Sequence, residues 1–165
     1  MASIAQIVPC LWFDGRAEQA VDFYCGIFAN SRVTTVSRYT EVGQAQHRQQ
    51  PGTVMMIAFE LNGQAFHALN GGPLFQFTPA LSLEVLCEDQ AEIDHFWERL
   101  GDGGNTDAQQ CGWLQDRYGL SWQIVPRALI AMLGDAASPP AQRVLGAVMT
   151  MKKLDLAALE RAYAS

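Results

Sequence analysis

Three polar side chains stand inside otherwise apolar, strand-like segments, and their types could support chemistry. His67 lies in QAFHALN, Glu84 in LSLEVLC and Gln123 in LSWQIV. An imidazole or a carboxylate in such a segment either faces a cavity, where it can bind or act as a general base, or is satisfied in place. For His67 the alternative is a hydrogen bond to a backbone carbonyl, and for Glu84 it is a solvent-exposed sheet edge. We expect Glu84 to face a cavity and leave both roles open for His67.

An internal repeat decides which way these side chains point. Residues 4–28 contain an apolar, strand-like run, a break and an amphipathic helical pattern, and residues 80–100 contain the same sequence of features. Phe23 of the first helix matches Phe96 of the second, an offset of 96 − 23 = 73. A repeat of this length predicts two copies of one structural module.

A predicted β-hairpin follows each helix. Residues 54–69 turn at Asn62-Gly63, a sequence that favours a tight two-residue turn, and residues 112–125 turn at residues 116–119. An offset of 56 aligns the two hairpins and pairs Glu60 with Asp116, Phe66 with Trp122, and His67 with Gln123.

The two offsets differ by 73 − 56 = 17 residues. The polar, glutamine-rich segment 39–52 accounts for that difference and is predicted to be a mobile loop. Residues 127–165 lie beyond the repeat and are helical in pattern, with Pro139 suited to a first turn and Asp155 to an N-cap.

Composition narrows the class of protein. The 165 residues are 49% hydrophobic and 17% charged, which predicts one domain with a packed core. A net charge of −6 disfavours nucleic-acid binding. Neither a signal peptide nor a membrane span is recognisable, so a cytoplasmic location is expected. The four cysteines have no CxxC spacing and are expected to be reduced thiols.

Two βαβββ modules would each cover one sheet face with a helix and leave the other face free. The free faces are expected to line a cavity between the modules, with apolar walls and a few polar groups. The residues predicted to contact a ligand there are His67, Glu84, Gln123, Ser82, Asn70, Trp12 and Trp113. Trp12 is equally well explained as core packing, and Asn70 as part of a structural turn.

Four segments resemble the PhnB-like branch of the vicinal-oxygen-chelate (glyoxalase, bleomycin-resistance and dioxygenase) superfamily: DGRAEQAVDFY, FELNGQAFHALNGGP, CGWLQDRYGLSWQIVP and AQRVLGAVMTMKKLDLAAL. The resemblance implies an α+β fold, with residues 1–165 as a single domain. Module one would span 4–72, module two 80–126 and the C-terminal helices 127–165. The branch is also labelled 3-demethylubiquinone-9 3-methyltransferase. A cofactor-dependent methyltransferase would need a βαβ unit with a glycine-rich loop, and Gly71-Gly72 instead precede Pro73.

The resemblance further implies four positions where metal-dependent relatives place ligands. Carried onto this sequence, they are His67, Ser82, Gln123 and Ile7, or Pro9 if no gap is allowed. Only His67 is a strong ligand for a divalent ion, so no metal and no other cofactor is expected. A bound metal, if present, would use His67, Glu84 and Gln123.

These observations favour a small-molecule-binding protein of the glyoxalase/bleomycin-resistance type. Its expected partners are a small organic ligand and a second copy of itself, without nucleic acid or membrane. The first alternative is a metal-dependent lyase, isomerase or dioxygenase that acts on a substrate with adjacent oxygens. The second is a dimeric structural scaffold whose C-terminal helices pack on a partner.

Overall fold

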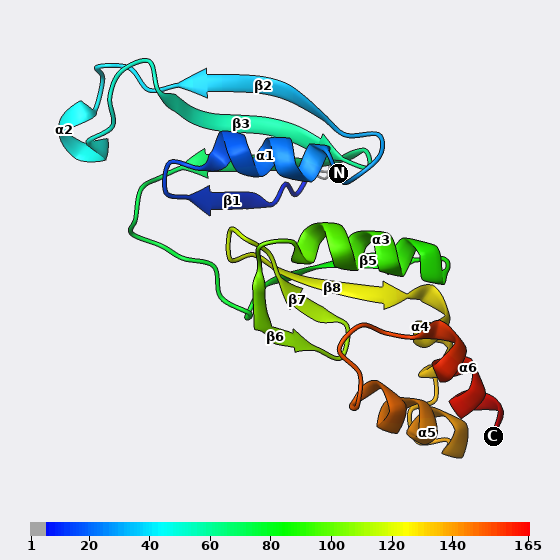
Figure 1. The fold of residues 1–165 in the computed structure, drawn as a ribbon. Helices are drawn as coiled ribbons and strands as arrows, with labels where there is room; N and C mark the ends of the chain where they lie inside the picture. The colour runs from blue at the N-terminus through cyan, green and yellow to red at the C-terminus, as the bar shows by residue number, and fades with distance from the viewer. Residues whose placement is uncertain (1–5) are drawn as a thin grey trace, which may run out of the picture. The chain divides into compact units, whose positions relative to one another are not determined.

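The computed structural model describes residues 6–165, and the predicted start of module one at residues 4–5 lies outside that range. The chain divides into two compact units, with the boundary between Gln76 and Phe77. Each unit contains one βαβββ module, so the predicted α+β repeat is confirmed (Figure 1). The C-terminal helices belong to the second unit.

The first module forms a four-stranded sheet in the order β1-β4-β3-β2. Its first and last strands are parallel, and its other pairs are antiparallel. Among residues 6–13, regular strand pairing begins at Cys10. The elements are β1 (Cys10–Phe13), α1 (Ala17–Cys25), β2 (Arg32–Arg38), α2 (Gln44–His47), β3 (Val54–Leu61) and β4 (Gln64–Asn70).

The second module repeats this arrangement in the order β5-β8-β7-β6. Its first and last strands are again parallel. The elements are β5 (Ser82–Cys87), α3 (Gln90–Gly101), β6 (Asn105–Gln110), β7 (Trp113–Gln115) and β8 (Ser121–Pro126). Strand β6 pairs irregularly, with a register shift between Asn105 and Gln110.

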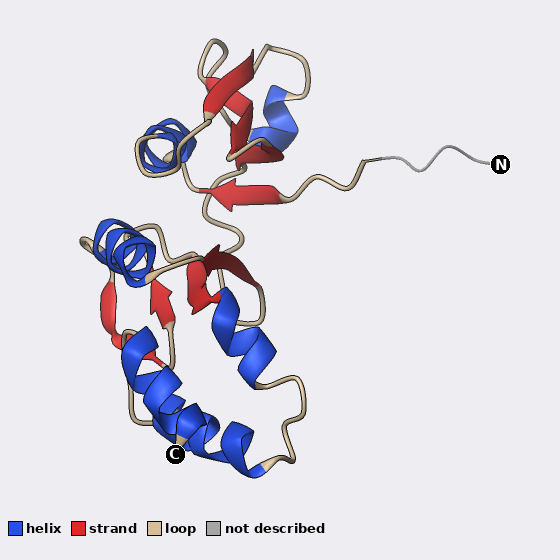
Figure 2. Ribbon diagram, turned by 90° about the vertical axis from the view of Figure 1, so that its right-hand side faces the viewer, coloured by secondary structure: helices blue, strands red, loops and turns tan. Residues whose placement is uncertain are grey.

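Alternation along the strands gives each sheet one buried face against its helix (Figure 2). In module one, Phe59, Phe66 and Ala68 are at most 6% exposed. In module two, Trp122 and Ile124 are at most 2% exposed. A Cβ atom placed on Gly101 of α3 would lie 3.9 Å from the Leu114 side chain, so the sheet packs closely against this helix. Trp122 is therefore part of the core. The opposite face of each sheet carries the polar candidates other than Asn70.

The two hairpins differ by one residue in their turns. Asn62 and Gly63 both have positive φ, as the tight turn between β3 and β4 requires. Glu60 pairs across that turn with Ala65, whereas Gln115 pairs with Ser121. Four residues separate the first pair and five the second. The alignment of Glu60 with Asp116 is therefore wrong by one position, because the second turn is longer.

Asp116 organises the longer turn. Its carboxylate accepts hydrogen bonds from the backbone N–H groups of Tyr118 and Leu120 and from the indole Nε1 of Trp122, at 2.8, 3.1 and 2.8 Å. Its side chain is almost fully buried. These three hydrogen bonds satisfy the buried carboxylate and tie the turn to the core beneath α3.

The insert between β2 and β3 contains the short helix α2 and packs around Tyr39. Tyr39 is 8% exposed, and its hydroxyl donates to the backbone oxygen of Asn70 at 2.7 Å. The His47 ring lies 4.6 Å from the Tyr39 ring, between centroids. This contact partly covers His47. A buried aromatic with a satisfied hydroxyl gives the insert an anchor that its composition does not reveal.

The C-terminal extension folds as α4 (Arg127–Met132), α5 (Pro139–Val148) and α6 (Leu156–Ala164). Ser138 and Asp155 cap α5 and α6, and Pro139 opens α5 as predicted. The apolar faces of the three helices form one cluster with β8; its buried members are Val125, Leu129, Val144, Val148, Leu154 and Leu159. No helix in residues 6–165 is long and apolar enough to cross a membrane.

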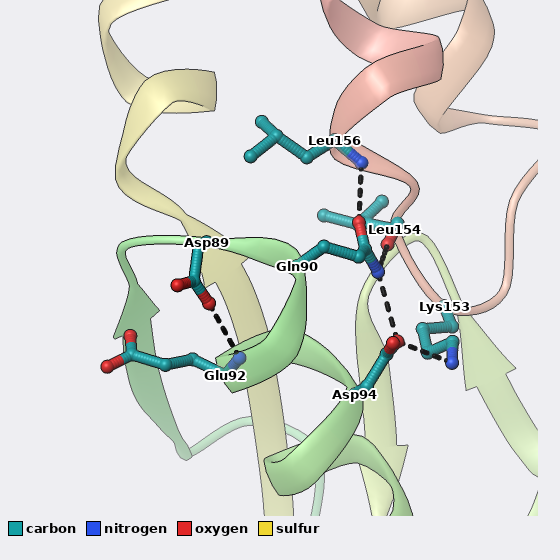
Figure 3. Close-up of polar contacts among 7 residues, drawn as sticks. All are labelled: Asp89, Gln90, Glu92, Asp94, Lys153, Leu154 and Leu156. Carbon is teal, nitrogen blue, oxygen red and sulfur yellow. Dashed lines mark hydrogen bonds and ion pairs between the residues drawn. The ribbon is translucent and has the colours of Figure 1, made fainter.

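Gln90 joins this extension to α3 (Figure 3). Its Oε1 accepts the Leu156 N–H at 2.8 Å, and its Nε2 donates to the Leu154 carbonyl at 3.2 Å and to Asp94 at 3.0 Å. Lys153 also pairs with Asp94 at 2.6 Å. The extension is therefore an integral part of the second unit.

Candidate functional site

A row of polar and aromatic side chains crosses the free face of the second sheet. Glu84 of β5 lies opposite Gln123 of β8, which lies opposite Trp113 of β7. Gln123 Nε2 donates to Ser82 Oγ at 2.8 Å, which leaves the amide oxygen of Gln123 as an acceptor. Four of the residues predicted to contact a ligand are thus brought together. We call Ser82, Glu84, Trp113 and Gln123 the polar row.

The end of this face beyond Glu84 and Gln123 is apolar and covered. Leu86 and Val125 lie two residues beyond Glu84 and Gln123, on the same side of their strands. Val125 is buried in the cluster made by the C-terminal helices, and Leu86 packs against it. The extension therefore covers the apolar end of the sheet, while Glu84 stays exposed and Gln123 and Trp113 are half-buried.

The free face of the first sheet carries a different set of groups. His67 of β4 lies between Cys10 of β1 and Ala58 of β3. Among the described residues, no hydrogen bond joins the His67 imidazole to a backbone carbonyl. Cys10 is the neighbour that the sequence did not suggest, because only the strand register places it beside the imidazole.

Strand pairing also corrects the alignment of the two first strands. Cys10 lies opposite His67 just as Glu84 lies opposite Gln123, so the first strands differ by 84 − 10 = 74 residues. The counterpart of Ser82 is therefore Val8, and neither Ile7 nor Pro9 holds that position. Ile7 is 93% exposed and precedes the strand. The expected offset of 73 came from the helices, and the linker before the first helix is one residue longer.

The four positions that metal-dependent relatives use are thus held by Val8, His67, Ser82 and Gln123. One imidazole, one hydroxyl, one amide and one alkyl group do not fit a divalent ion, which needs three or more strong ligands. Within residues 6–165, no group of three or more His, Cys, Asp or Glu side chains is placed to hold a metal.

Asn70 lies on the helix-covered face of the first sheet. Its Oδ1 accepts the Ala17 N–H at 2.9 Å, and its Nδ2 donates to Glu18 and to the Val54 carbonyl, each at 3.1 Å. It is 6% exposed. These bonds fix the start of α1 to the sheet and support the interpretation that Asn70 has a structural role.

Trp12 lies on the free face of the first sheet, above the turn that follows β4. Its Nε1 donates to the Gly72 carbonyl at 2.8 Å, and its ring makes an edge contact with Phe75. A Cβ at position 71 would lie 2.2 Å from the indole ring, so only glycine fits there. The indole is thus held in a fixed position with its donor satisfied.

Two of the thiols, those of Cys10 and Cys87, are poorly suited to act as nucleophiles. Burial raises the pKa of Cys10, and burial together with Glu92, Asp89 and Glu88 raises the pKa of Cys87 to about 12. A raised pKa lowers the fraction of reactive thiolate at neutral pH. Cys10 and His67 therefore do not form an activated pair.

Charge is divided unequally between the units. Residues 77–165 contain twelve acidic and seven basic residues, whereas residues 1–76 contain five acidic and four basic ones. Strands β5 to β8 contain no lysine or arginine. On the first sheet, Glu60 pairs with Arg32 at 2.9 Å. Within residues 6–165, the Glu84 carboxylate has no such partner, a difference that the sequence did not indicate.

A shallow pocket of about 580 Å³ lies elsewhere in the second unit, between α3 and the segment that leads into α6. Its lining includes Gln90, Asp94 and Lys153, whose polar groups are bonded to one another and to the backbone. Because these bonds hold the extension in place, the pocket is best explained as the seam between two packed elements.

Comparisons with known proteins identify the family. The family model described as 3-demethylubiquinone-9 3-methyltransferase matches residues 5–125. A PhnB protein from Bacillus cereus with the same description has a solved structure that is 36% identical, with a TM-score of 0.63; the match covers 74% of this chain and 99% of that one. None of the curated proteins matches the chain.

More distant structures share the fold. Protein PA1353 from Pseudomonas aeruginosa is 20% identical, with a TM-score of 0.52, and the match covers 74% of this chain and 98% of that one. The fosfomycin resistance protein FosX from Listeria monocytogenes is 15% identical, with a TM-score of 0.52, over 78% of this chain and 96% of its own. The chain belongs to the PhnB, or 3-demethylubiquinone-9 3-methyltransferase, family, and it shares its fold with these more distant structures.

Proposed function

We propose that this protein is a cytoplasmic small-molecule-binding protein, and that its ligand binds on the free face of the second sheet. The polar row is the observation that supports the proposal. Half-buried amide, hydroxyl and indole groups beside an exposed carboxylate form the kind of surface that small-molecule sites use to orient a ligand.

Ligand binding is proposed to need no bound metal or other cofactor. The support is the donor chemistry at Val8, His67, Ser82 and Gln123, which offers a single strong ligand. A methyltransferase activity of the cofactor-dependent kind has no support either, because Gly71 and Gly72 follow β4 and lead into an irregular segment. Elemental analysis of untagged protein purified without chelator tests the first point. A full equivalent of metal that is lost in His67→Ala would favour the metal-dependent alternative.

A thermal-unfolding screen against small organic compounds tests the function itself. A ligand present at one hundred times its Kd stabilises the folded state by about 2.7 kcal/mol. For a chain of this size, that corresponds to a rise in Tm of roughly 5–10 °C. We expect Gln123→Leu to weaken binding of such a compound about tenfold, because the amide is replaced by an alkyl group of similar size.

Gln44→Leu is the matched control, because Gln44 is exposed on α2 and lies outside the polar row. Retained affinity in this variant would show that loss of a glutamine alone has no effect. The proposal fails if no compound stabilises the protein. It also fails if Gln123→Leu binds every stabilising compound as tightly as the wild type does.

We also propose a homodimer, while the scaffold alternative loses its main support. The apolar faces of α4 to α6 are buried against β8 in their own unit, so they are not free to cover a partner. Leu145 and Met149 remain exposed on or beside α5, at 40% and 69%. Size-exclusion chromatography with light scattering gives the oligomeric state directly, and a monomer at micromolar concentration would end the dimer proposal.

A further inference from the structure

We propose that the ligand carries a positive charge, as a protonated amine on an apolar body, and that Glu84 binds that charge beside the ring of Trp113. This inference rests on the proposed small-molecule-binding function and names its ligand class. It depends on the position of Glu84, on the groups beside it and on the missing counter-charge.

The Glu84 carboxylate lies at one end of the polar row. Glu84 follows Ser82 by two residues on the same side of β5 and lies opposite Gln123. Gln123 donates its Nε2 to Ser82, so its amide oxygen is available as a second acceptor in the same row. A carboxylate and an amide oxygen together suit an ammonium group, which has donors and no acceptor.

Trp113 supplies the third element of the row, because it lies opposite Gln123 on the adjacent strand. Its ring is half-buried on the free face. An indole ring attracts a cation through its face and offers apolar contact to a hydrocarbon body. The row therefore runs from a negative charge, through an acceptor, to an aromatic surface.

The counter-charge that would normally neutralise Glu84 is missing from its own sheet. Strands β5 to β8 contain no lysine or arginine, and the nearby bases Arg117 and Arg127 pair with Asp102 and Glu88. The exposed-face carboxylate of the first sheet, Glu60, has Arg32 as its partner. The surplus of acidic residues in the second unit further favours a cation over an anion.

The test uses three probes with the same aromatic body: 2-phenylethylammonium, 2-phenylethanol and 3-phenylpropionate. Ligand-observed NMR titrations at pH 7 give a Kd for each probe with the full-length protein. We expect the ammonium probe to bind at least about tenfold more tightly than the carboxylate probe, because one is attracted and the other repelled. Raising the salt concentration should weaken binding of the ammonium probe and leave that of the alcohol unchanged.

Two variants locate the effect. Glu84→Gln keeps the shape of the side chain and should weaken the ammonium probe about tenfold without affecting the alcohol. Asp107→Asn removes the same charge from exposed Asp107 on β6 and should leave all three affinities unchanged. Circular dichroism spectra that match the wild type keep a folding defect from being mistaken for lost binding.

The inference is overturned if the carboxylate probe binds as tightly as the ammonium probe, or if Glu84→Gln retains full affinity for the ammonium. Equal losses in Glu84→Gln and Asp107→Asn would overturn it as well, since they would indicate a diffuse charge effect. Tight binding of the alcohol with no role for Glu84 would leave the proposed function standing without its ligand class. If none of the probes binds, the ligand class is rejected, and the compound screen decides the function separately.

Discussion

The buried faces of the two modules are alike, whereas their exposed faces differ. Toward the helices, Phe66 of the first sheet corresponds to Trp122 of the second, and both are buried. On the free faces, Cys10 and His67 of the first module correspond to Glu84 and Gln123 of the second. Packing restricts the buried positions to apolar residues of adequate size, whereas the exposed positions are free to acquire binding chemistry.

The modules also fix their helices in different ways. Helix α1 has no side-chain cap from residues close to it in sequence. Its Ala17 N–H instead donates to the side chain of Asn70, which is 53 residues away in sequence. Helix α3 is capped locally, because the Asp89 carboxylate accepts the Glu92 N–H at 2.9 Å (Figure 3). It is then tied to the C-terminal extension through Gln90 and Asp94. Removal of each link should therefore affect a different part of the molecule.

Asn70→Ala should have the largest effect. The variant loses the bonds to Ala17, Glu18 and Val54 and leaves a buried N–H and a buried carbonyl without this partner. We expect a loss of about 3 kcal/mol in the free energy of unfolding, measured by urea denaturation. Hydrogen exchange should localise the loss of protection to α1 and the first sheet.

The matched control is Asn105→Ala, because exposed Asn105 makes one local hydrogen bond, to the N–H of Asp107. Its free energy of unfolding should change by less than about 1 kcal/mol. A similar loss in the two variants would show that Asn70 is no more important than an exposed residue at the start of a strand. The contrast between the modules would then be lost.

Gln90→Leu should have a smaller effect, confined to the second unit. Three hydrogen bonds disappear, but the site is only partly buried, so water can replace some of them. We expect a loss of about 1–2 kcal/mol, with reduced hydrogen-exchange protection in α6. Gln110→Leu, on the exposed side of β6, is the control and should leave the protection of α6 unchanged. Unchanged protection in Gln90→Leu would mean that the apolar cluster alone holds the extension.

Several features of the fold could be predicted because their signals are local. Asn62-Gly63 specifies its own turn, and Ser138-Pro139 and Asp155 mark helix starts by their chemistry. The alternation of apolar residues likewise predicts which side of β8 carries Gln123. Each of these inferences requires only residues that are close together in sequence.

Other features depend on register, which the sequence specifies weakly. The helix offset of 73 suggested Pro9 as the counterpart of Ser82 (82 − 73 = 9), and only the pairing of Cys10 with His67 moves it to Val8. A shift of one residue reverses the face that a side chain occupies, so small differences in turn length change the site. The bond between Asn70 and Ala17 and the missing base beside Glu84 are equally non-local, because both depend on which strands become neighbours.

Lys153→Met should have the smallest effect and tests the outermost link of the extension. In the wild type, the hydrogen bond from Lys153, followed by that from Gln90, lowers the pKa of Asp94 below its usual value. The variant should therefore raise that pKa toward the ordinary value of about 3.9. An NMR titration of the side-chain carboxyl carbons measures the shift.

The sign of the pH dependence follows from the lowered pKa. The ion pair contributes stability above the ordinary pKa of an aspartate, and this contribution is lost as the pH falls through the lowered value in the folded protein. Wild type and Lys153→Met should thus differ in stability at neutral pH and converge in acid. The neighbouring Lys152→Met is the control, because Lys152 is exposed and the shift of Asp94 does not depend on it. Because Asp94 and Lys153 are both partly exposed, at 42% and 35%, the difference at neutral pH should be smaller than the one caused by Gln90→Leu. A larger difference would indicate that the charge pair, and not the amide of Gln90, is the main polar link between α3 and the extension.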